Sequence, residues 1–492
     1  MIAETPMMPA SGALHVDAHS FHDVVVGDRR VLFHLPTSSL FQLDRVGGEV
    51  LDFVKMRPSF TETDVRDWII ARAPQGEAVT PAQVAEVLHD FQSLEILRTD
   101  ATQRQESRLE VKEFPLSSLV ISVSTGCNLS CSYCYKEDLD KPANGRKMDF
   151  DTATQGIELL LREGASREQI NVVFLGGEPL TNLPLIKQVV AYTERRGAEE
   201  GKKVDFTMTT NATLLTEDIV SYLDEHRFGI SVSMDGPKAV HDRRRIMING
   251  RGSYDVVAAK AKMLLSRYRS RPVGARVTLS AGATDVMGIY RHLKNDIGFF
   301  EVGFAPVTTS VDDALNLSSD ELREVFEGMK TLGREYLEAA VQNRNLGFSN
   351  MHQLMSDLFE GRKKSLPCGA GVGLLALDSA GDLNLCHRFT GSTLPTFGNV
   401  VDGIAKDRLG GFIEAAADLT GKPCATCRIR KLCAGGCYHE SYARYTDPLS
   451  PTYHYCDLMR EWVDFGVAIY VELLEKNPSF LMQHIDSRRT KQ

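Results

Sequence analysis

Short apolar runs alternate with helical stretches from residue 119 onward. The candidate strands are "LVISVST", "INVVFLGGEP", "DFTMTTNA", "GISVSMDGP", "ARVTLS" and "EVGFAPV". This alternation predicts parallel βαβ units, in which ligands gather at the carboxyl ends of the strands. Almost every polar or glycine-rich motif of this region follows such a strand, so we expect the functional site there.

The pattern before this region is different. Residues 21–44 predict short strands, and three amphipathic helices follow. The first helix has an apolar stripe of Val46, Val50, Leu51 and Val54. Capping signals for the next two are Thr61 with Asp64, and Thr80 with Pro81 and Gln83. The polar residues 98–114 then predict a linker.

The chain length is compatible with roughly three domains, because single cores stop growing at about 250 to 300 residues. A helix beginning at Ser318, with Glu321 three residues later, opens a connecting region. We therefore expect an N-terminal module, an α/β core, a helical connector and a cysteine-rich domain, at residues 1–105, 106–310, 311–366 and 367–492.

Composition and charge narrow the class of protein. Of 492 residues, 43% are hydrophobic and 25% charged, as in ordinary soluble proteins. The net charge of -9 gives no reason to expect nucleic acid or an anionic membrane as partner, despite the local basic run "HDRRR". The sequence shows no secretory signal and no apolar stretch long enough to span a membrane. We expect a cytoplasmic protein with reduced cysteines.

Three cysteines lie within "CNLSCSYC", namely Cys127, Cys131 and Cys134. A structural zinc site needs four ligands and a redox dithiol needs two. Three cysteines therefore indicate a metal centre with one open position. The pattern, with the aromatic Tyr133 before the last cysteine, resembles the signature of radical S-adenosylmethionine enzymes. The resemblance implies a [4Fe-4S] cluster whose fourth iron is chelated by S-adenosylmethionine.

Other strand-end motifs are similar to those of the same family. "GGEP" contains Gly176, Gly177 and Glu178, and the resemblance implies that its backbone and carboxylate meet the methionine ammonium group. Asn211 and Ser233 occupy later strand ends that usually contact this cofactor. Arg276 is a candidate for the cofactor carboxylate, or simply a surface arginine. Each motif alone is also compatible with a turn or a cap; their order along the chain favours cofactor binding.

Seven further cysteines lie near the C-terminus: Cys368, Cys386, Cys424, Cys427, Cys433, Cys437 and Cys456. A zinc ribbon also uses C-x2-C pairs, but the whole spacing resembles the SPASM extension, which carries two auxiliary [4Fe-4S] clusters. Carried over by position, one auxiliary cluster takes Cys424, Cys427, Cys433 and Cys456. The other takes Cys368, Cys386 and Cys437, which leaves its fourth iron open or bound by a non-cysteine ligand or substrate.

These resemblances imply a fold class. It is α/β, a partial (β/α)6 TIM-type radical SAM barrel, with an N-terminal PqqD-like winged-helix peptide-recognition domain and a C-terminal SPASM iron-sulfur domain. In PqqD-type modules an extended peptide adds to a strand edge; a purely structural winged helix is the alternative.

The chain as a whole resembles the family of quinohemoprotein amine dehydrogenase maturation enzymes, through "HLPTSSLFQLD", "CGAGVGLLALDSAGDLNLCHRFTG" and "CAGGCYHESYARY". Its members join cysteine sulfurs to aspartate and glutamate methylene carbons in the dehydrogenase γ subunit. The resemblance implies this small polypeptide as substrate, with an external electron donor such as flavodoxin or ferredoxin. It also implies hydrogen abstraction by a 5'-deoxyadenosyl radical, then capture by a thiolate. Asp235 is the first candidate for the thiol's base, although it is also a plausible turn residue, and His387 is the second.

Alternatives remain open. Maturases of six-cysteine peptides also make thioethers, and sulfatase maturases dehydrogenate a side chain. A peptide-binding iron-sulfur or zinc scaffold without chemistry, and a tRNA-modifying radical enzyme, are the readings from other classes. A scaffold would not cleave S-adenosylmethionine, so an assay of cleavage by the reduced protein separates it from an enzyme. The acidic net charge argues against the RNA-modifying enzyme.

Overall fold

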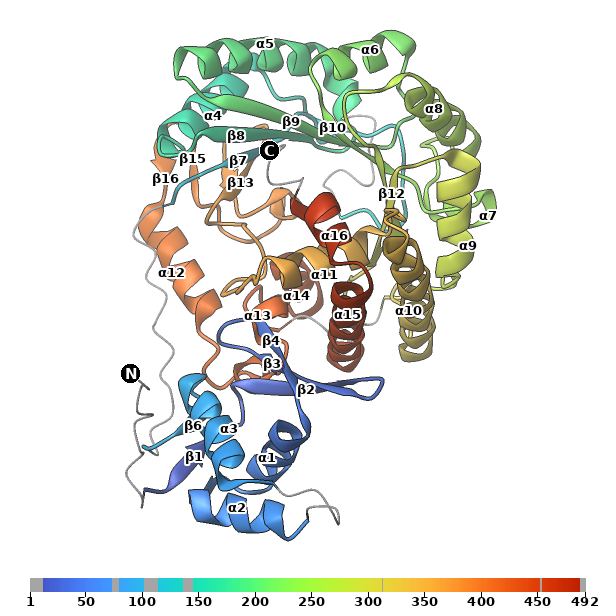
Figure 1. Cartoon of the computed structure of the whole chain (residues 1–492). Coiled ribbons are helices and arrows are strands. Elements are labelled where there is room, and N and C mark those ends of the chain that lie inside the picture. Colours follow the sequence, from blue (N-terminus) through green and yellow to red (C-terminus); the bar gives the residue numbers. More distant parts are fainter. Residues whose placement is uncertain are drawn as a thin grey trace.

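The computed structural model describes residues 12–72, 79–100, 114–135, 145–311, 313–451 and 454–486. A curved sheet with helices on its outer side forms the main body, and a smaller module lies at one end (Figure 1). Most of the linker predicted at residues 98–114 lies outside the described residues.

The predicted strands of the main body are confirmed. They are β7 (Ser118–Ser122), β8 (Gln169–Leu175), β9 (Lys203–Thr210), β10 (Gly229–Ser233), β11 (Gly274–Leu279) and β12 (Glu301–Pro306). They are parallel and adjacent in sequence order, as expected for consecutive βα units. The helices between them are α4 (Phe150–Glu163), α5 (Leu183–Glu199), α6 (Glu217–Glu225), α7 (Lys238–Arg244), α8 (Tyr254–Arg267) and α9 (Val286–Arg291).

Burial alternates along these strands because successive side chains point to opposite faces. In β8, Ile170, Val172 and Phe174 are fully buried, whereas Asn171 and Val173 between them are only half-buried. The apolar face packs against the outer helices and belongs to the main hydrophobic core. The inner face is thus the side on which a ligand has room.

Two strands from the cysteine-rich region extend this sheet. β13 (Leu374–Leu377) pairs in parallel with β7, and β14 (Leu383–Asn384) pairs with β13 in antiparallel orientation. The sheet therefore continues past the boundary predicted at residue 367. The sequence "LLAL" is too short for its periodicity to reveal a strand.

The N-terminal module contains the three predicted helices, α1 (Arg45–Met56), α2 (Glu62–Ile70) and α3 (Pro81–Ser93). The capping boxes Thr61–Asp64 and Thr80–Gln83 are both present, which confirms those predictions. Its strands are β1 (Leu14–Val16), β2 (Phe21–Val26), β3 (Arg29–His34), β4 (Ser39–Leu43), β5 (Ser59–Phe60) and β6 (Leu97–Arg98).

The sheet β2-β3-β4 lies between two cores. Leu32 of β3 belongs to the core of the module, whereas its neighbours Val31 and Phe33 belong to that of the main body. All three are at most 1% exposed. Because alternate side chains of β3 pack into the two cores, this sheet connects the module to the main body.

The remaining helices and strands belong to the main body. α10 (Ser319–Val341) begins with the predicted capping box of Ser318 and Glu321. It packs on α15 (Cys456–Lys476), which also contacts α11 (Ser349–Phe359) and β2. The others are β15 (Gly398–Asn399), β16 (Gly403–Ile404), α12 (Lys406–Ala417), α13 (Arg430–Cys433), α14 (Tyr438–Tyr445) and α16 (Pro478–Leu481). Among the described helices, none combines the length and apolarity that a membrane span requires.

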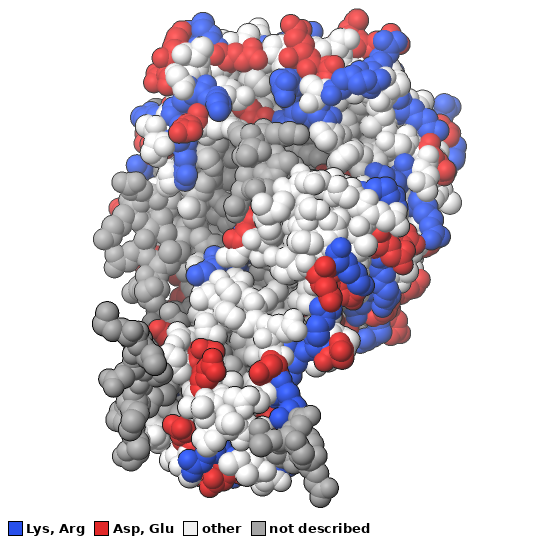
Figure 2. Space-filling model, in the orientation of Figure 1, with Lys and Arg blue, Asp and Glu red and all other residues white. Residues whose placement is uncertain are grey.

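Charged side chains of both signs are interspersed over α5, α6 and the helices down to α10 (Figure 2). On α5, for example, Arg196 binds Glu158 at 2.7 Å and also Glu199 at 2.6 Å. On this face the charges of these helices are therefore mixed.

Candidate functional site

The loop of three cysteines follows β7 at the carboxyl end of the sheet. The segment after α7 holds it: Ser130 N–H donates to the Ile246 carbonyl at 2.8 Å, and Ser132 N–H donates to the Arg244 carbonyl at 3.0 Å. Leu129 and Met247 form a further isolated bridge. The loop is therefore fixed from the outside by residues more than 100 positions later in the sequence.

Gly176 and Gly177 allow the loop after β8 to lie against the cysteine loop. A Cβ atom on Gly177 would lie 2.3 Å from the Gly126 carbonyl oxygen, and one on Gly176 would lie 2.2 Å from that of Ser124. The Gly177 N–H donates to the Ser124 carbonyl at 2.7 Å. The structure thus gives the two glycines a packing function, and cofactor contact through their remaining backbone atoms stays a prediction.

Glu178, predicted to meet the methionine ammonium group, lies in the loop directly after β8. Its side chain is buried, with a residue exposure of 1%, and Oε1 accepts hydrogen bonds from Leu180 N–H at 3.1 Å and the Thr210 hydroxyl at 2.7 Å. Oε2 accepts from Asn211 N–H at 2.7 Å. These contacts join the ends of β8 and β9, and the contact of Glu178 with an ammonium group stays a prediction. Burial raises the pKa of Glu178 to about 7, although its three donors favour the ionised form.

The other predicted cofactor residues lie at neighbouring strand ends. Asn211 is close to the cysteine loop, with its side-chain nitrogen 3.7 Å from Cys127 Sγ and 3.0 Å from Asn128 Oδ1. Ser233 is half-buried and lies in register with Arg276 on β11. Arg276 is exposed, and among the described residues its guanidinium makes no ion pair. Asn211, Ser233 and Arg276 therefore lie on or directly after three neighbouring strands, β9, β10 and β11.

Asp235 is part of a buried polar group that includes Tyr133. Its Oδ2 accepts from the Tyr133 hydroxyl at 2.5 Å and from Arg245 Nε at 3.0 Å, and Oδ1 accepts from Thr278 N–H at 3.1 Å. These contacts fix the position of the Asp235 carboxylate relative to the cysteine loop, and its role as base stays a prediction. Arg245, which sequence reasoning missed, belongs to the "HDRRR" run.

The C-terminal cysteines form two groups. The pKa of Cys386 is raised to about 11, mainly by burial and to a lesser extent by the neighbouring Cys437 and Cys368. Burial also raises the pKa of Cys433 to about 11, with added effects of Cys424, Cys427 and Cys456. Cys386 therefore lies near Cys368 and Cys437, and Cys433 lies near Cys424, Cys427 and Cys456; that each set holds a cluster stays a prediction.

Tyr135 connects the first cysteine loop with the group of Cys386 and Cys437. It follows Cys134 directly, and its pKa is raised by burial and, to a lesser extent, by Cys134, Cys386 and Cys437. The Arg388 guanidinium carbon lies 5.0 Å from the Tyr135 ring centroid. Tyr135, which sequence reasoning missed, thus lies near cysteines of both groups.

Arg388 and His387 line this same region. Arg388 Nη1 lies 3.8 Å from Cys437 Sγ and 3.4 Å from Glu440 Oε1. His387 is half-buried, with its ring centroid 6.3 Å from that of Tyr135. The predicted base His387 therefore lies beside Cys386 and near Tyr135, whereas Asp235 contacts Tyr133 and Arg245 at the end of β10.

Comparison with known proteins adds an independent observation. Residues 121–287, which contain the three-cysteine loop and the strand-end motifs, match the family model of the Radical SAM superfamily. The chain carries a radical SAM domain. Its relatives include the cysteine-type anaerobic sulfatase-maturating enzyme of Clostridium perfringens (strain 13 / Type A), which is 24% identical over 365 residues, covering 72% of this chain and 96% of the relative. The serine-type enzyme of Klebsiella pneumoniae is 25% identical over 336 residues, covering 66% and 82%.

Solved structures share the fold. "Native anSMEcpe with bound AdoMet" has a TM-score of 0.63 at 19% identity, covering 73% of this chain and all of that one (100%). The structure of Streptococcus suis SuiB bound to precursor peptide SuiA has a TM-score of 0.50 at 15% identity, covering 90% and 99%. The second similarity extends over most of the chain, including regions outside the radical SAM domain.

The thiols of the radical SAM domain fit an iron-sulfur cluster. Burial raises the pKa of Cys127 to about 12 and that of Cys131 to about 11, so without a cation both are protonated thiols. Binding of cationic iron would release these protons. Among the described side chains, no three Cys, His, Asp or Glu residues converge on a position for a single metal ion. In a four-iron cluster each thiolate binds a different iron, so the ligands are distributed around a larger object.

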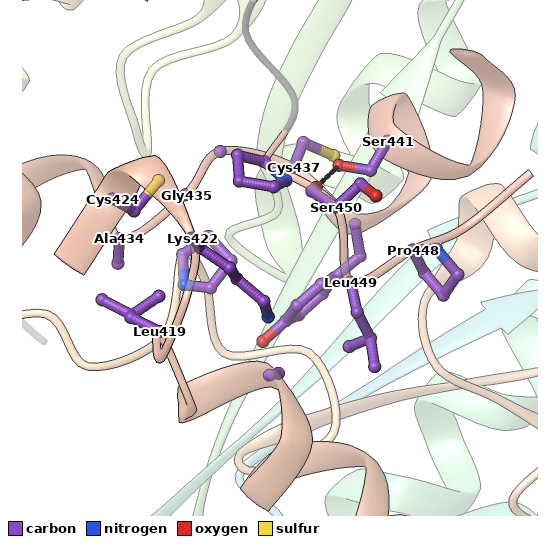
Figure 3. Close-up of a pocket in the computed structure, with 15 residues that line it drawn as sticks. Leu419, Lys422, Cys424, Ala434, Gly435, Cys437, Ser441, Pro448, Leu449 and Ser450 are labelled. Carbon is purple, nitrogen blue, oxygen red and sulfur yellow. Dashed lines mark hydrogen bonds between the residues drawn. The ribbon is translucent and has the colours of Figure 1, made fainter. Parts of the chain in front are cut away.

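A small pocket lies between the two C-terminal cysteine groups (Figure 3). Cys424 of one group and Cys437 of the other both line it, together with Lys422. The Ser441 hydroxyl donates to the Ser450 carbonyl at 2.5 Å at one side. The pocket is therefore lined by one cysteine of each group.

Proposed function

We propose that this chain is a radical SAM enzyme with three [4Fe-4S] clusters that forms thioether cross-links in a peptide. The cross-links join cysteine sulfurs to methylene carbons of aspartate and glutamate side chains. The proposed substrate is the small γ subunit of quinohemoprotein amine dehydrogenase, and reduction requires an external donor such as flavodoxin or ferredoxin.

The distribution of all ten cysteines is the observation that carries this proposal. Three lie in the radical SAM loop, three around Cys386 and four around Cys433. The set around Cys386 leaves one iron of a four-iron cluster without a cysteine ligand. An iron with an open position is suited to bind a substrate thiolate, which supports chemistry on cysteine.

The N-terminal module supports a peptide substrate. β4 forms one edge of the sheet β2-β3-β4, and its Phe41 and Gln42 are exposed. An edge strand offers backbone hydrogen-bonding groups to an extended peptide. A structure that is similar over 90% of this chain contains a bound precursor peptide, which supports a peptide as the class of substrate.

When bound, the cluster and S-adenosylmethionine supply a carbon radical that removes hydrogen from an unactivated methylene group. The chain itself has to place the peptide, exclude water and accept the thiol proton. Asp235, which forms an ion pair with Arg245, is our first candidate for the acceptor. His387 is the second candidate, because it lies beside Cys386 and near Tyr135.

The relatives favour a second candidate function within the same class. Both relatives described above are sulfatase-maturating enzymes, and their matches cover 72% and 66% of this chain. A maturase that dehydrogenates a cysteine or serine side chain in a target protein is therefore the alternative. Both candidates modify a peptide or protein, and they differ in whether a new carbon-sulfur bond is formed.

Anaerobic reconstitution and co-expression test the proposal. Iron and sulfide content are measured for the wild type and for variants that lack one cysteine group each, and the γ subunit is analysed by mass spectrometry. We expect about twelve irons per chain, a loss of two hydrogens per cross-link and cysteines that no longer react with alkylating reagents. About four irons per chain would contradict the auxiliary clusters. A full iron content with an unchanged peptide mass would contradict the proposed substrate.

A further inference from the structure

Arg245 and Asp235 form a buried ion pair directly behind the cysteine loop. Their Nε and Oδ2 atoms are 3.0 Å apart, and their side chains are 10% and 3% exposed. Arg245 Nη1 also lies 4.0 Å from Cys131 Sγ. We propose that Arg245, held by Asp235, positions this loop and raises the reduction potential of the cluster bound there. This inference rests on the proposed function, since it assumes a cluster on Cys127, Cys131 and Cys134.

The pair is anchored to the barrel on one side. Asp235 follows β10, and its Oδ1 accepts from Thr278 N–H on β11. Its backbone N–H contacts His241 Nδ1 at 3.3 Å, and His241 Nε2 lies 3.0 Å from Ser253 Oγ. The carboxylate therefore has a fixed place relative to two strand ends and to α7.

The other side of the pair is anchored to the cysteine loop. Ser253 Oγ donates to the Arg245 carbonyl at 2.7 Å, which fixes the backbone from which this side chain extends. The Arg245 guanidinium carbon lies 5.4 Å from the centroid of the Tyr133 ring, whose hydroxyl binds the same Asp235 oxygen. Arg245 thus contacts Cys131 through its guanidinium and Tyr133 through the ring face.

Fold stability alone gives a weak reason for such a pair. A buried ion pair must overcome the desolvation of both groups, and well-packed apolar residues often stabilise a protein as well. The orientation of this pair is informative, because the cation rather than the carboxylate lies next to the sulfur. A fixed positive charge near a thiolate ligand favours addition of an electron to a cluster, and burial reduces the screening of that charge.

The two charged residues have opposite expected effects. Replacing Arg245 by glutamine removes a positive charge and should shift the midpoint potential to more negative values. Replacing Asp235 by asparagine removes a negative charge and should shift it to more positive values. If the pair had a purely structural role, both variants should shift the midpoint potential in the same direction. The sign of the shift therefore separates the two explanations.

The experiment uses the anaerobically reconstituted full-length protein without peptide. Redox titration followed by electron paramagnetic resonance is restricted to the signal that changes on addition of S-adenosylmethionine. The variants are Arg245→Gln, Arg245→Lys and Asp235→Asn, with Arg243→Gln as the control. Arg243 is exposed and donates to the Gly282 carbonyl at 2.8 Å. We expect opposite shifts for Arg245→Gln and Asp235→Asn, and a potential close to wild type for Arg245→Lys and Arg243→Gln.

Hydrogen exchange of the iron-free protein gives a second readout. The Ser130 and Ser132 amides, which are bonded to the segment around Arg245, should exchange faster in Arg245→Gln than in Arg243→Gln. Equal exchange in the two variants would overturn the positioning role. Shifts of the same sign, or none, in Arg245→Gln and Asp235→Asn would overturn the charge effect. Absence of iron from the loop in the wild type would instead contradict the proposed function, together with the charge effect that depends on it.

Discussion

His22 Nε2 lies 2.9 Å from Asp464 Oδ1, although the two residues are 442 positions apart in the sequence. The other oxygen of Asp464 accepts from Arg428 Nη2 at 2.7 Å, and Arg428 directly follows Cys427. Burial alone would raise the pKa of Asp464, but the bonds from His22 and Arg428 lower it below its usual range. One carboxylate therefore joins the N-terminal module to the loop of the four-cysteine group.

We predict that Asp464→Asn loosens the N-terminal module. A lost charged hydrogen bond costs about 1–3 kcal/mol, which should appear as faster hydrogen exchange in β2 while the barrel strands stay unchanged. Glu194→Gln is the matched control, because Glu194 also binds a histidine, His226, at 2.7 Å but on the outer helices. Unchanged exchange in β2 of Asp464→Asn would show that the shared sheet alone holds the module.

Gly177→Ala should disrupt the cysteine loop. The added Cβ atom would lie 2.3 Å from the Gly126 carbonyl, a backbone atom that cannot move without displacing the loop. Overpacking of this kind costs about 1–3 kcal/mol or more. Unfolding with denaturant and iron content measure the effect. Gly411→Ala in α12 serves as control, because nothing lies within 4 Å of its added Cβ and alanine favours a helix.

Glu178 should make stability depend on pH. Its pKa in the folded protein is raised from 4.5 to about 7, so the folded state binds the proton more strongly than the unfolded state. The stabilising contribution of protonated Glu178 is complete below about pH 4.5 and is lost as the pH rises through 7. This difference in pKa between the folded and the unfolded state corresponds to about 3 kcal/mol of unfolding free energy.

Denaturant unfolding of the iron-free protein between pH 5 and 8 tests this dependence. The stability of the wild type relative to Glu178→Gln should fall as the pH rises. The comparison uses the slope, because glutamine also changes the hydrogen bonds to Thr210 and Asn211. A difference that stays constant over this range would contradict the raised pKa.

Arg388→Gln should weaken the group of Cys368, Cys386 and Cys437 selectively. Arg388 contacts the Cys437 sulfur and the half-buried Glu440. Its loss removes a cation beside one thiolate and removes the ion pair of Glu440 with Arg388. We expect iron content to fall by nearly one cluster while cleavage of S-adenosylmethionine continues. The control is Arg408→Gln, an exposed arginine bound to the Thr396 carbonyl. Equal iron in both variants would contradict this role.

Local features of the fold could be predicted well from the sequence. The capping boxes at Thr61, Thr80 and Ser318 depend on residues three positions apart, so they are readable wherever the helix begins. The six parallel strands were visible from their apolar runs, and the motifs lie at their carboxyl ends as expected. Strand β13 was missed, because four apolar residues carry no clear period.

The sequence by itself determined which chemistry-bearing residues the chain has and the order in which the strands present them. Only the tertiary structure decided what each side chain faces. Glu178 is enclosed by residues 32 and 33 positions later, and Tyr133 meets Asp235 across 102 positions. Spacing along a chain reveals neighbours within a turn or a helix, whereas the partner of a buried charge depends on which strand ends the fold brings together.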